Sequence, residues 1–209
     1  MTYSIRRLAK EDLDQVNEID REAFPSQWPP ANYKQELQNK IAHYIVACDD
    51  AKTIAAPVVI PKSRFGFFNW LMSRFGRQQR VQADPPTPVV QKYIVGFSGL
   101  WMMADEAHVT NLAVRQQYRG KGLGELLLLA SIDLATELNA SFLTLEVRAS
   151  NLIAQSLYNK YGFMQMGVRR GYYLDNREDA IIMTTESISS ESFREQVRQL
   201  RAALAQKLA

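Results

Sequence analysis

The hydrophobic and polar positions along the chain follow two periods, one typical of helices and one typical of strands. Apolar residues recur at helical spacing from about Glu11 to Phe24 and again from Ser190 onward, so both stretches predict amphipathic helices. Further helices are predicted at about 32–38, from the turn after residue 114 to about 138, and at about 152–161. The predicted strands, in chain order, cover 3–8, 43–50, 92–103, 106–114, 142–147, 163–173 and 179–187. This order predicts an α/β fold with a mixed sheet flanked by helices.

Composition narrows the class of protein. The 209 residues, 46% of them hydrophobic, suit one domain with additions and can bury a sizeable core. Charges within the first ten residues argue against a secretory signal or transit peptide, and no apolar run reaches the length of about 18 residues that a spanning helix needs. The single cysteine, Cys48, cannot form an internal disulfide, and with two histidines it cannot supply a zinc cage. We therefore expect a cytoplasmic protein without a metal.

The charge is unevenly distributed. Residues 51–92 hold seven basic residues against one acid and five of the eight prolines, whereas the whole chain carries a net charge of only +3. This composition marks an insertion. We predict a domain over 1–189 that the insertion at about 51–92 interrupts, followed by a C-terminal amphipathic helix over 190–209.

Within the insertion, residues 64–80 predict a helix with an aromatic and apolar face flanked by basic residues. Such a helix can lie at a membrane surface or dock on a ribosome or a partner protein. It can equally pack on its own domain, or the segment can be a disordered loop tethered by prolines. The sequence leaves these alternatives open. Sequence-specific binding of nucleic acid is not expected.

The stretch "QQYRGKGLGELLL", Gln116 to Leu128, places three glycines and two basic residues between a strand and a helix. The first amide groups of a helix lack internal partners and carry partial positive charge, and glycines let an anion approach them closely. Arg119 and Lys121 add full charges. The turn fits neither the Walker nor the dinucleotide-binding pattern. It predicts a phosphate-binding turn, with tight packing of helix on strand as the alternative.

Three separated blocks carry a family resemblance. "RGKGLG", Arg119 to Gly124, matches the R/Q-x-x-G-x-G/A signature of the GNAT superfamily of N-acetyltransferases. "LEVRASNLIAQSLYNKYGF", Leu145 to Phe163, and "RRGYYLDNREDAIIM", Arg169 to Met183, resemble more closely the RimI family of ribosomal-protein-alanine N-acetyltransferases. The resemblance covers roughly residues 3–50 and 93–188, and the insertion and the last residues have no counterpart in that family.

The resemblance implies the GNAT acyl-CoA N-acyltransferase fold, acetyl-CoA as co-substrate without a metal, and the N-terminal alanine of a small-subunit ribosomal protein as acceptor. It also implies Glu146 as general base and Tyr158 as general acid. From their placement alone, we expect Tyr172 and Tyr173 to line the acceptor groove. The implied acetyl-CoA contacts are Leu112, Ala113, Val114, Arg119, Gly120, Lys121, Gly122, Leu123, Gly124 and Asn151.

The chemistry of direct transfer from acetyl-CoA to an amine suits these residue types. An α-amino group, with a pKa near 7.7 to 8.0, needs only mild base assistance, whereas a lysine near 10.4 needs more. An unperturbed carboxylate is a weak base, so we expect burial or a relay water at Glu146. A phenol in hydrogen-bond reach of the departing thiolate can protonate it, which is the role implied for Tyr158.

Each of these residues also has a structural alternative. Glu146 could cap a strand end or pair with Arg148, Tyr158 could simply pack on an apolar helix, and Asn151 could be a helix N-cap. His108 is a second candidate base, but nothing near it in the sequence completes a constellation. Cys48 is expected in the core, because no partner histidine for a nucleophile is indicated.

Two rival functions stay open. One is an acetyltransferase of the same fold that acts on other protein N-termini or on lysine. The other is a non-catalytic module that binds acetyl-CoA as a sensor, against which the presence of both an acid and a base argues.

Overall fold

The computed structural model of the protein describes residues 3–26, 30–55 and 90–208. Its chain divides into two compact units, one formed by 1–52 with 92–209 and the other by 53–91. The fold described below is that of the first unit. The predicted insertion helix at 64–80 lies outside the described residues, and the division into a domain over 1–189 and a tail over 190–209 stays a prediction.

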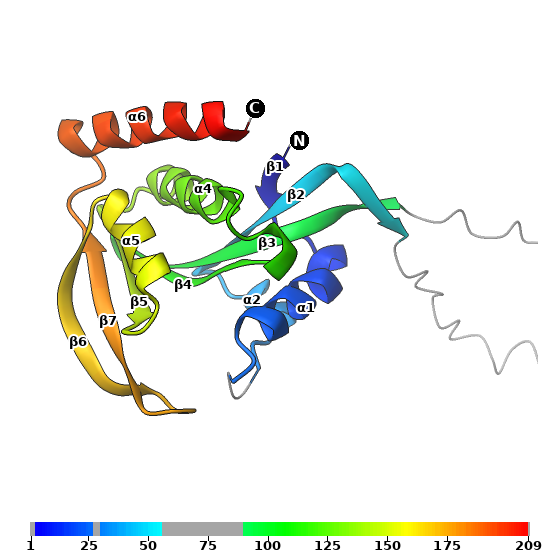
Figure 1. Cartoon of the computed structure of the whole chain (residues 1–209), viewed down its shortest axis with the longest axis horizontal. Helices are drawn as coiled ribbons and strands as arrows, with labels where there is room; N and C mark the ends of the chain where they lie inside the picture. Colours follow the sequence, from blue (N-terminus) through cyan, green and yellow to red (C-terminus); the bar gives the residue numbers. More distant parts are fainter. Residues whose placement is uncertain (1–2, 27–29, 56–89, 209) are drawn as a thin grey trace, which may run out of the picture. The chain divides into compact units, whose positions relative to one another are not determined.

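Seven strands form one mixed sheet in the order β1-β2-β3-β4-β5-β7-β6 (Figure 1). The strands are β1 (Tyr3–Arg7), β2 (Ala42–Ala55), β3 (Val90–Met103), β4 (Glu106–Val114), β5 (Phe142–Arg148), β6 (Phe163–Tyr173) and β7 (Glu178–Thr185). β4 and β5 are parallel, whereas β1 with β2, β3 with β4, β5 with β7 and β6 with β7 are antiparallel. The prediction of a mixed sheet flanked by helices is confirmed.

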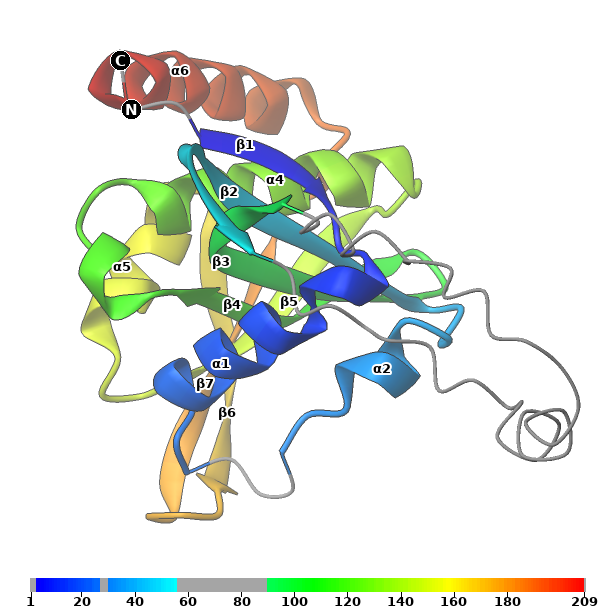
Figure 2. The same cartoon turned by 90° about the vertical axis from the view of Figure 1, so that its right-hand side faces the viewer.

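Helices cover both faces of this sheet (Figure 2). The helical segments are η1 (Lys10–Asp12), α1 (Leu13–Ala23), α2 (Tyr33–Glu36), η2 (Gln116–Tyr118), α4 (Leu123–Glu137), α5 (Leu152–Lys160) and α6 (Glu191–Leu208). One core contains the buried faces of α4, α5 and α6, and a second core lies under α1 and α2. No helix among the described residues is both long and apolar enough to cross a membrane.

The sequence explains why α4 lies at the centre of the larger core. Its run of leucines is apolar around most of the helix, and Leu127, Leu128 and Leu129 are each at most 1% exposed. A helix that is apolar on all sides needs cover on all sides. The sheet provides that cover on one side and α6 on the other, through Phe193, Val197 and Leu204, all buried.

Two irregularities shape the middle of the sheet. The register between β3 and β4 shifts at Gly99 and Leu100, which indicates a bulge. The parallel pairing of β4 with β5 ends at Val109 opposite Leu145, although β4 runs on to Val114 and β5 to Arg148. The edge of β4 that faces β5 therefore has no paired strand over 110–114 in the part of the chain that the structure describes. Backbone groups on that edge can bond a ligand, apart from the carbonyl of Val114, which accepts from Arg119.

Candidate active site

Glu146 lies on β5, one strand from the centre of the sheet. Successive side chains on a strand point to opposite faces. Leu145 and Val147 are buried in the core beneath α4, so Glu146 faces the α1 and α2 side. Its side chain is only 8% exposed and has two cationic or proton-donating neighbours. Oε2 lies 3.0 Å from Nε2 of His108, and Oε1 lies 3.0 Å from a terminal guanidinium nitrogen of Arg169.

His108 lies on β4, directly opposite Thr144 of β5 in the parallel register. Its Nδ1 is 2.8 Å from Oγ1 of Thr144, and the Thr144 hydroxyl donates to Glu106. Because that hydroxyl gives its one proton to Glu106, it accepts at its oxygen, so Nδ1 of His108 is the donor in the first bond. Nε2 is then the nitrogen that faces Glu146.

The fold supplies the partner that the sequence does not show. His108 is the second candidate base, with no constellation near it along the chain, and in the structure it lies directly beside Glu146. Pairing of β4 with β5 brings together residues that are 38 positions apart. Sequence reasoning also missed Thr144 and Arg169. Thr144 is on the same strand as Glu146, whereas Arg169 is on β6, which β7 separates from β5.

The electrostatics at Glu146 favour the carboxylate. When Nε2 of His108 also carries a proton, its hydrogen bond and then its charge, together with the charge of Arg169, hold the pKa of Glu146 below its ordinary value, although burial acts in the opposite direction. Burial therefore does not make Glu146 a stronger base by itself.

Tyr158 lies on α5 and is 8% exposed, with its ring 5.7 Å from that of Phe163. Burial, with a smaller contribution from Tyr173, raises the pKa of Tyr158 to about 12. Its hydroxyl has no hydrogen-bond partner among the described residues. The ring is packed as a core tyrosine would be, and the hydroxyl is protonated and free to donate.

The glycine turn between β4 and α4 adopts the conformation that its glycines permit. Gly120 has a φ of 75° and Gly122 a φ of 86°, both in the left-handed region. The first helical bond runs from the amide of Leu126 to the carbonyl of Gly122. The amides of residues 123–125 therefore have no partner in the helix, which is the arrangement that attracts anions.

The basic residues of the turn differ in their contacts. Nε of Arg119 donates to the carbonyl of Val114 at 3.1 Å, which ties the turn to the end of β4. The exposed Lys121 places its ammonium 4.9 Å from the ring centre of Tyr118. A small cavity of about 160 Å³ adjoins the turn, lined by Asp49, Lys52, Gln117, Tyr118 and Lys121.

The remaining predicted residues lie around the open end of the strand pair. Leu112, Ala113 and Val114 form the end of β4 that pairs with β3 but not with β5, and Leu123 and Gly124 begin α4. A Cβ at Gly124 would lie 3.7 Å from Leu157 and 3.9 Å from Leu112, so this helix start packs between β4 and α5. Asn151 is the N-cap of α5, where its side chain accepts from the amide of Ala154 at 3.2 Å.

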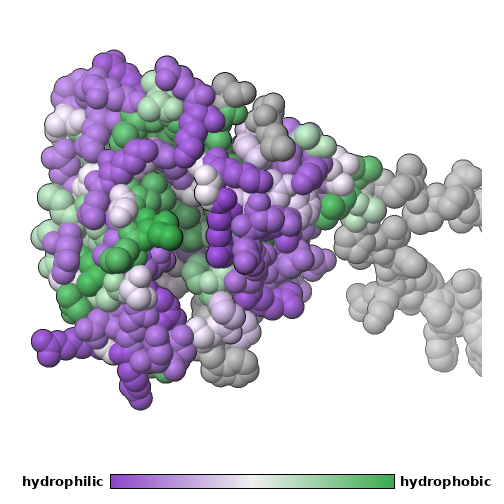
Figure 3. Space-filling view, viewed as in Figure 1, coloured by the Kyte–Doolittle hydropathy of each residue, from purple (hydrophilic) through white to green (hydrophobic). Residues whose placement is uncertain are grey.

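Tyr172 and Tyr173 end β6, with ring centres 5.2 Å apart in an edge-to-face arrangement. Tyr172 is 43% exposed, and the guanidinium carbon of Arg148 lies 3.9 Å from the ring centre of Tyr173. On the face shown in Figure 3, apolar surface gathers over α5, where Leu152 and Ile153 are exposed, between the polar α6 and the polar β6–β7 turn. Polar and apolar groups thus surround the open end of the β4–β5 pair.

Comparison with known proteins agrees with this geometry. The profile of the acetyltransferase (GNAT) family matches residues 13–163. A Bacillus subtilis chain named for alanine N-acetylation of ribosomal protein bS18 is 33% identical over 181 residues, which are 86% of this chain and 93% of that one. An N-alpha-acetyltransferase of Sulfurisphaera tokodaii is 32% identical over 182 residues, 87% of this chain and 91% of that one.

Among solved structures, the ribosomal-protein-S18-alanine N-acetyltransferase of Escherichia coli superposes with a TM-score of 0.62 at 26% identity, covering 91% of this chain and 97% of that one. The fold, the glycine turn and the sequence relatives therefore agree. The chain belongs to the GNAT family of acetyltransferases, enzymes that transfer the acetyl group of acetyl-CoA.

Proposed function

We propose that this acetyltransferase modifies the α-amino group of a protein N-terminus, with the N-terminal alanine of a small-subunit ribosomal protein as its acceptor. The observation that carries the proposal is the pairing of Glu146 with His108 at the open end of β4 and β5. Both sequence relatives described above bear names of enzymes that acetylate α-amines or N-terminal alanine.

Acetyl-CoA would lie along the open edge of β4. The free amides of residues 123–125, with Arg119 and Lys121, would bind its pyrophosphate at the start of α4. The backbone of Leu112, Ala113 and Val114 would bond the pantetheine arm, and one of these amides would polarise the thioester carbonyl. The side-chain oxygen of Asn151 already caps α5, so only the side-chain NH2 group of Asn151 would be available to contact acetyl-CoA.

The reaction then needs one proton acceptor and one proton donor. The amine nitrogen attacks the thioester carbon and forms the new C–N bond, and its proton passes to the Glu146–His108 pair. A His108 ring protonated only at Nδ1 turns its Nε2 lone pair toward the carboxylate, so a proton that arrives between them is held by both groups. The C–S bond breaks as the leaving sulfur takes the hydroxyl proton of Tyr158.

The electrostatics favour an α-amine over lysine as the acceptor. A lysine side chain, with a pKa near 10.4, needs a strong base, whereas an α-amine near 7.7 to 8.0 is partly neutral at pH 7. The pKa of Glu146 is held low by His108 and Arg169, which weakens the carboxylate as a base. This site therefore suits an α-amine, which needs less assistance from a base than a lysine side chain does.

A mass-spectrometric transfer assay tests the proposal. The acceptors are a ribosomal-protein peptide that begins with a free alanine and the same peptide N-terminally blocked but containing lysine. We expect mass gain on the free N-terminus alone. Gain on the blocked peptide would assign the enzyme to lysine instead, and a panel that replaces the first alanine by serine or methionine would show how strictly alanine is required.

A double variant, Glu146→Gln with Tyr158→Phe, separates the enzyme from the sensor alternative. Both changes keep the shape of the side chain, so acetyl-CoA binding measured by calorimetry should be retained while transfer is lost. Unchanged transfer in this variant would contradict the roles proposed for both residues.

A further inference from the structure

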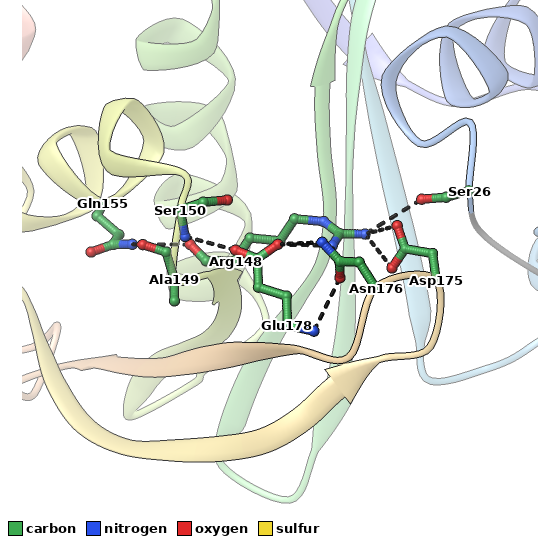
Figure 4. Close-up of polar contacts among 8 residues, drawn as sticks. All are labelled: Ser26, Arg148, Ala149, Ser150, Gln155, Asp175, Asn176 and Glu178. Carbon is green, nitrogen blue, oxygen red and sulfur yellow. Dashed lines mark hydrogen bonds and ion pairs between the residues drawn. The ribbon is translucent and has the colours of Figure 1, made fainter.

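Arg148 joins three parts of the fold that are far apart in the sequence (Figure 4). Its guanidinium forms a two-bond contact with Asp175, at 3.1 and 3.0 Å, and a bond to Glu178 at 3.1 Å, both on the β6–β7 hairpin. The same group lies 3.4 Å from the hydroxyl of Ser26, in the segment after α1. The arginine thus connects the end of β5, the hairpin turn and the N-terminal layer.

The hairpin side of this cluster is anchored a second time. Glu178 accepts from the amide of Ser150 at 2.7 Å, at the turn that leads from β5 into α5. These bonds, with those of Asn176 and Arg148, lower the pKa of Glu178 to about 2. The Ser26 hydroxyl is the largest cause that lowers the pKa of Asp175, so Ser26 interacts with the hairpin as well as with Arg148.

The cluster lies beside the reacting groups. Arg148 is two residues after Glu146 on β5, so both side chains leave the same face of the sheet. The guanidinium stacks on Tyr173, and Tyr173 contributes, after burial, to the raised pKa of Tyr158. With acetyl-CoA bound at the glycine turn, as proposed above, the amine would approach Glu146 from the α1 and α2 side of the sheet, between the segment after α1 and the hairpin.

We propose that Arg148 is a positioning residue for the acceptor: it holds the segment at Ser26 and the hairpin at Asp175 at a fixed separation and keeps Tyr173 in place, so that a peptide N-terminus enters between them. This inference rests on the proposed function. It concerns binding of the acceptor only. Binding of acetyl-CoA should not depend on Arg148, because Arg148 contacts none of the residues of the glycine turn.

The test uses the full chain with Arg148→Met, which keeps the length of the side chain and removes its charge, and Arg148→Lys, which keeps one charge but cannot make the paired bonds. The matched control is Arg201→Met, since Arg201 forms a single 2.6 Å ion pair with Asp133 on α4, away from the site. Loss of charge-assisted bonds predicts a rise in the KM for peptide of about tenfold or more for Arg148→Met. The kcat, the Kd for acetyl-CoA and the Arg201→Met variant should stay near wild type, with Arg148→Lys intermediate.

A second pair of variants keeps the test decisive if Arg148→Met folds poorly. Asp175→Asn and Ser26→Ala each remove one end of the link, and each should raise the same peptide KM by a smaller factor. Combining Asp175→Asn with Arg148→Met should add little, because both changes remove the same contact. A peptide KM that stays at the wild-type value in all these variants would overturn the inference, as would equal increases in the KM values of both substrates.

Hydrogen exchange on the protein without substrate provides a readout that does not depend on activity. Arg148→Met should accelerate exchange at the amides of Gly171, Glu178 and Ser150, which bond within the hairpin or to it, and leave exchange in α4 unchanged. Unchanged exchange at these three amides would show that Arg148 does not hold the hairpin.

Failure of the proposed function is a different result, seen in the transfer assay. It would be a wild-type protein that binds acetyl-CoA but modifies no α-amine.

Discussion

Nε2 of His108 and Oε2 of Glu146 lie 3.0 Å apart, on two parallel strands whose last pair is Val109 with Leu145. The contact joins an imidazole to a carboxylate at the point where the two strands stop pairing. A second bond fixes the opposite nitrogen of His108 to Thr144. The pair is thus oriented from both sides before any substrate binds.

Removing His108 tests this pair. In His108→Leu we expect kcat/KM at pH 8 to fall by roughly ten- to a hundredfold, because general-base assistance typically contributes factors of this order. The variant also loses the largest cause that lowers the pKa of Glu146, so the carboxylate should protonate at a higher pH and the acid limb of the rate profile should move to higher pH. Steady-state kinetics across pH 5 to 9 measure both effects.

The control for His108→Leu is His43→Leu, which changes the other histidine of the chain. An equal loss of activity in both variants would contradict a specific role of His108.

The raised pKa of Tyr158 predicts how the reaction rate depends on pH in the alkaline range. Its pKa of about 12 means that the hydroxyl keeps its proton through pH 10. The kcat/KM of the wild type should therefore rise as the acceptor amine deprotonates near pH 8 and then stay level up to pH 10. Tyr158→Phe should lower kcat by about a hundredfold at every pH, with acetyl-CoA affinity retained. An alkaline decline below pH 10 that disappears in Tyr158→Phe would contradict the raised pKa.

Gly120 and Gly122 should respond differently to alanine. Both have positive φ, so each substitution strains the backbone by about 1 kcal/mol. A Cβ at Gly120 has no atom within 4 Å, whereas a Cβ at Gly122 would lie 3.1 Å from a methyl group of Leu204 on α6. Gly122→Ala should therefore lower the melting temperature more than Gly120→Ala. Thermal unfolding of the two glycine variants measures this difference. Adding Leu204→Ala to Gly122→Ala would remove the contact with the methyl group but none of the backbone strain.

Glu178 predicts a pH dependence of stability. Its folded pKa of about 2 lies below the ordinary value of 4.5, so its stabilising contribution is fully present above pH 4.5 and is lost as the pH falls toward 2. Glu178→Gln should lower the melting temperature at pH 7, and the difference from wild type should shrink progressively between pH 4.5 and 2. A difference that is constant across this range would show that the carboxylate charge is not responsible.

Much of the architecture follows from the sequence alone. The order of the strands and helices along the chain was predicted to within a few residues, because periodicity depends only on near neighbours. The glycine turn could likewise be recognised, since the residues that need positive φ and those that supply charge are adjacent. The insertion at 51–92 stays a prediction from composition: its two ends belong to β2 and β3, and its predicted helix lies outside the described residues.

Tertiary structure decided the partners of those residues. His108 could not be matched with Glu146, nor Arg148 with Ser26 and Asp175, because each contact depends on which strands pair and in what register. The same holds for the end of the β4–β5 pairing, which leaves the edge of β4 open. A sequence determines these long-range contacts only through the packing of the whole chain: local patterns specify each element, and the register between elements is settled when their apolar faces are buried together.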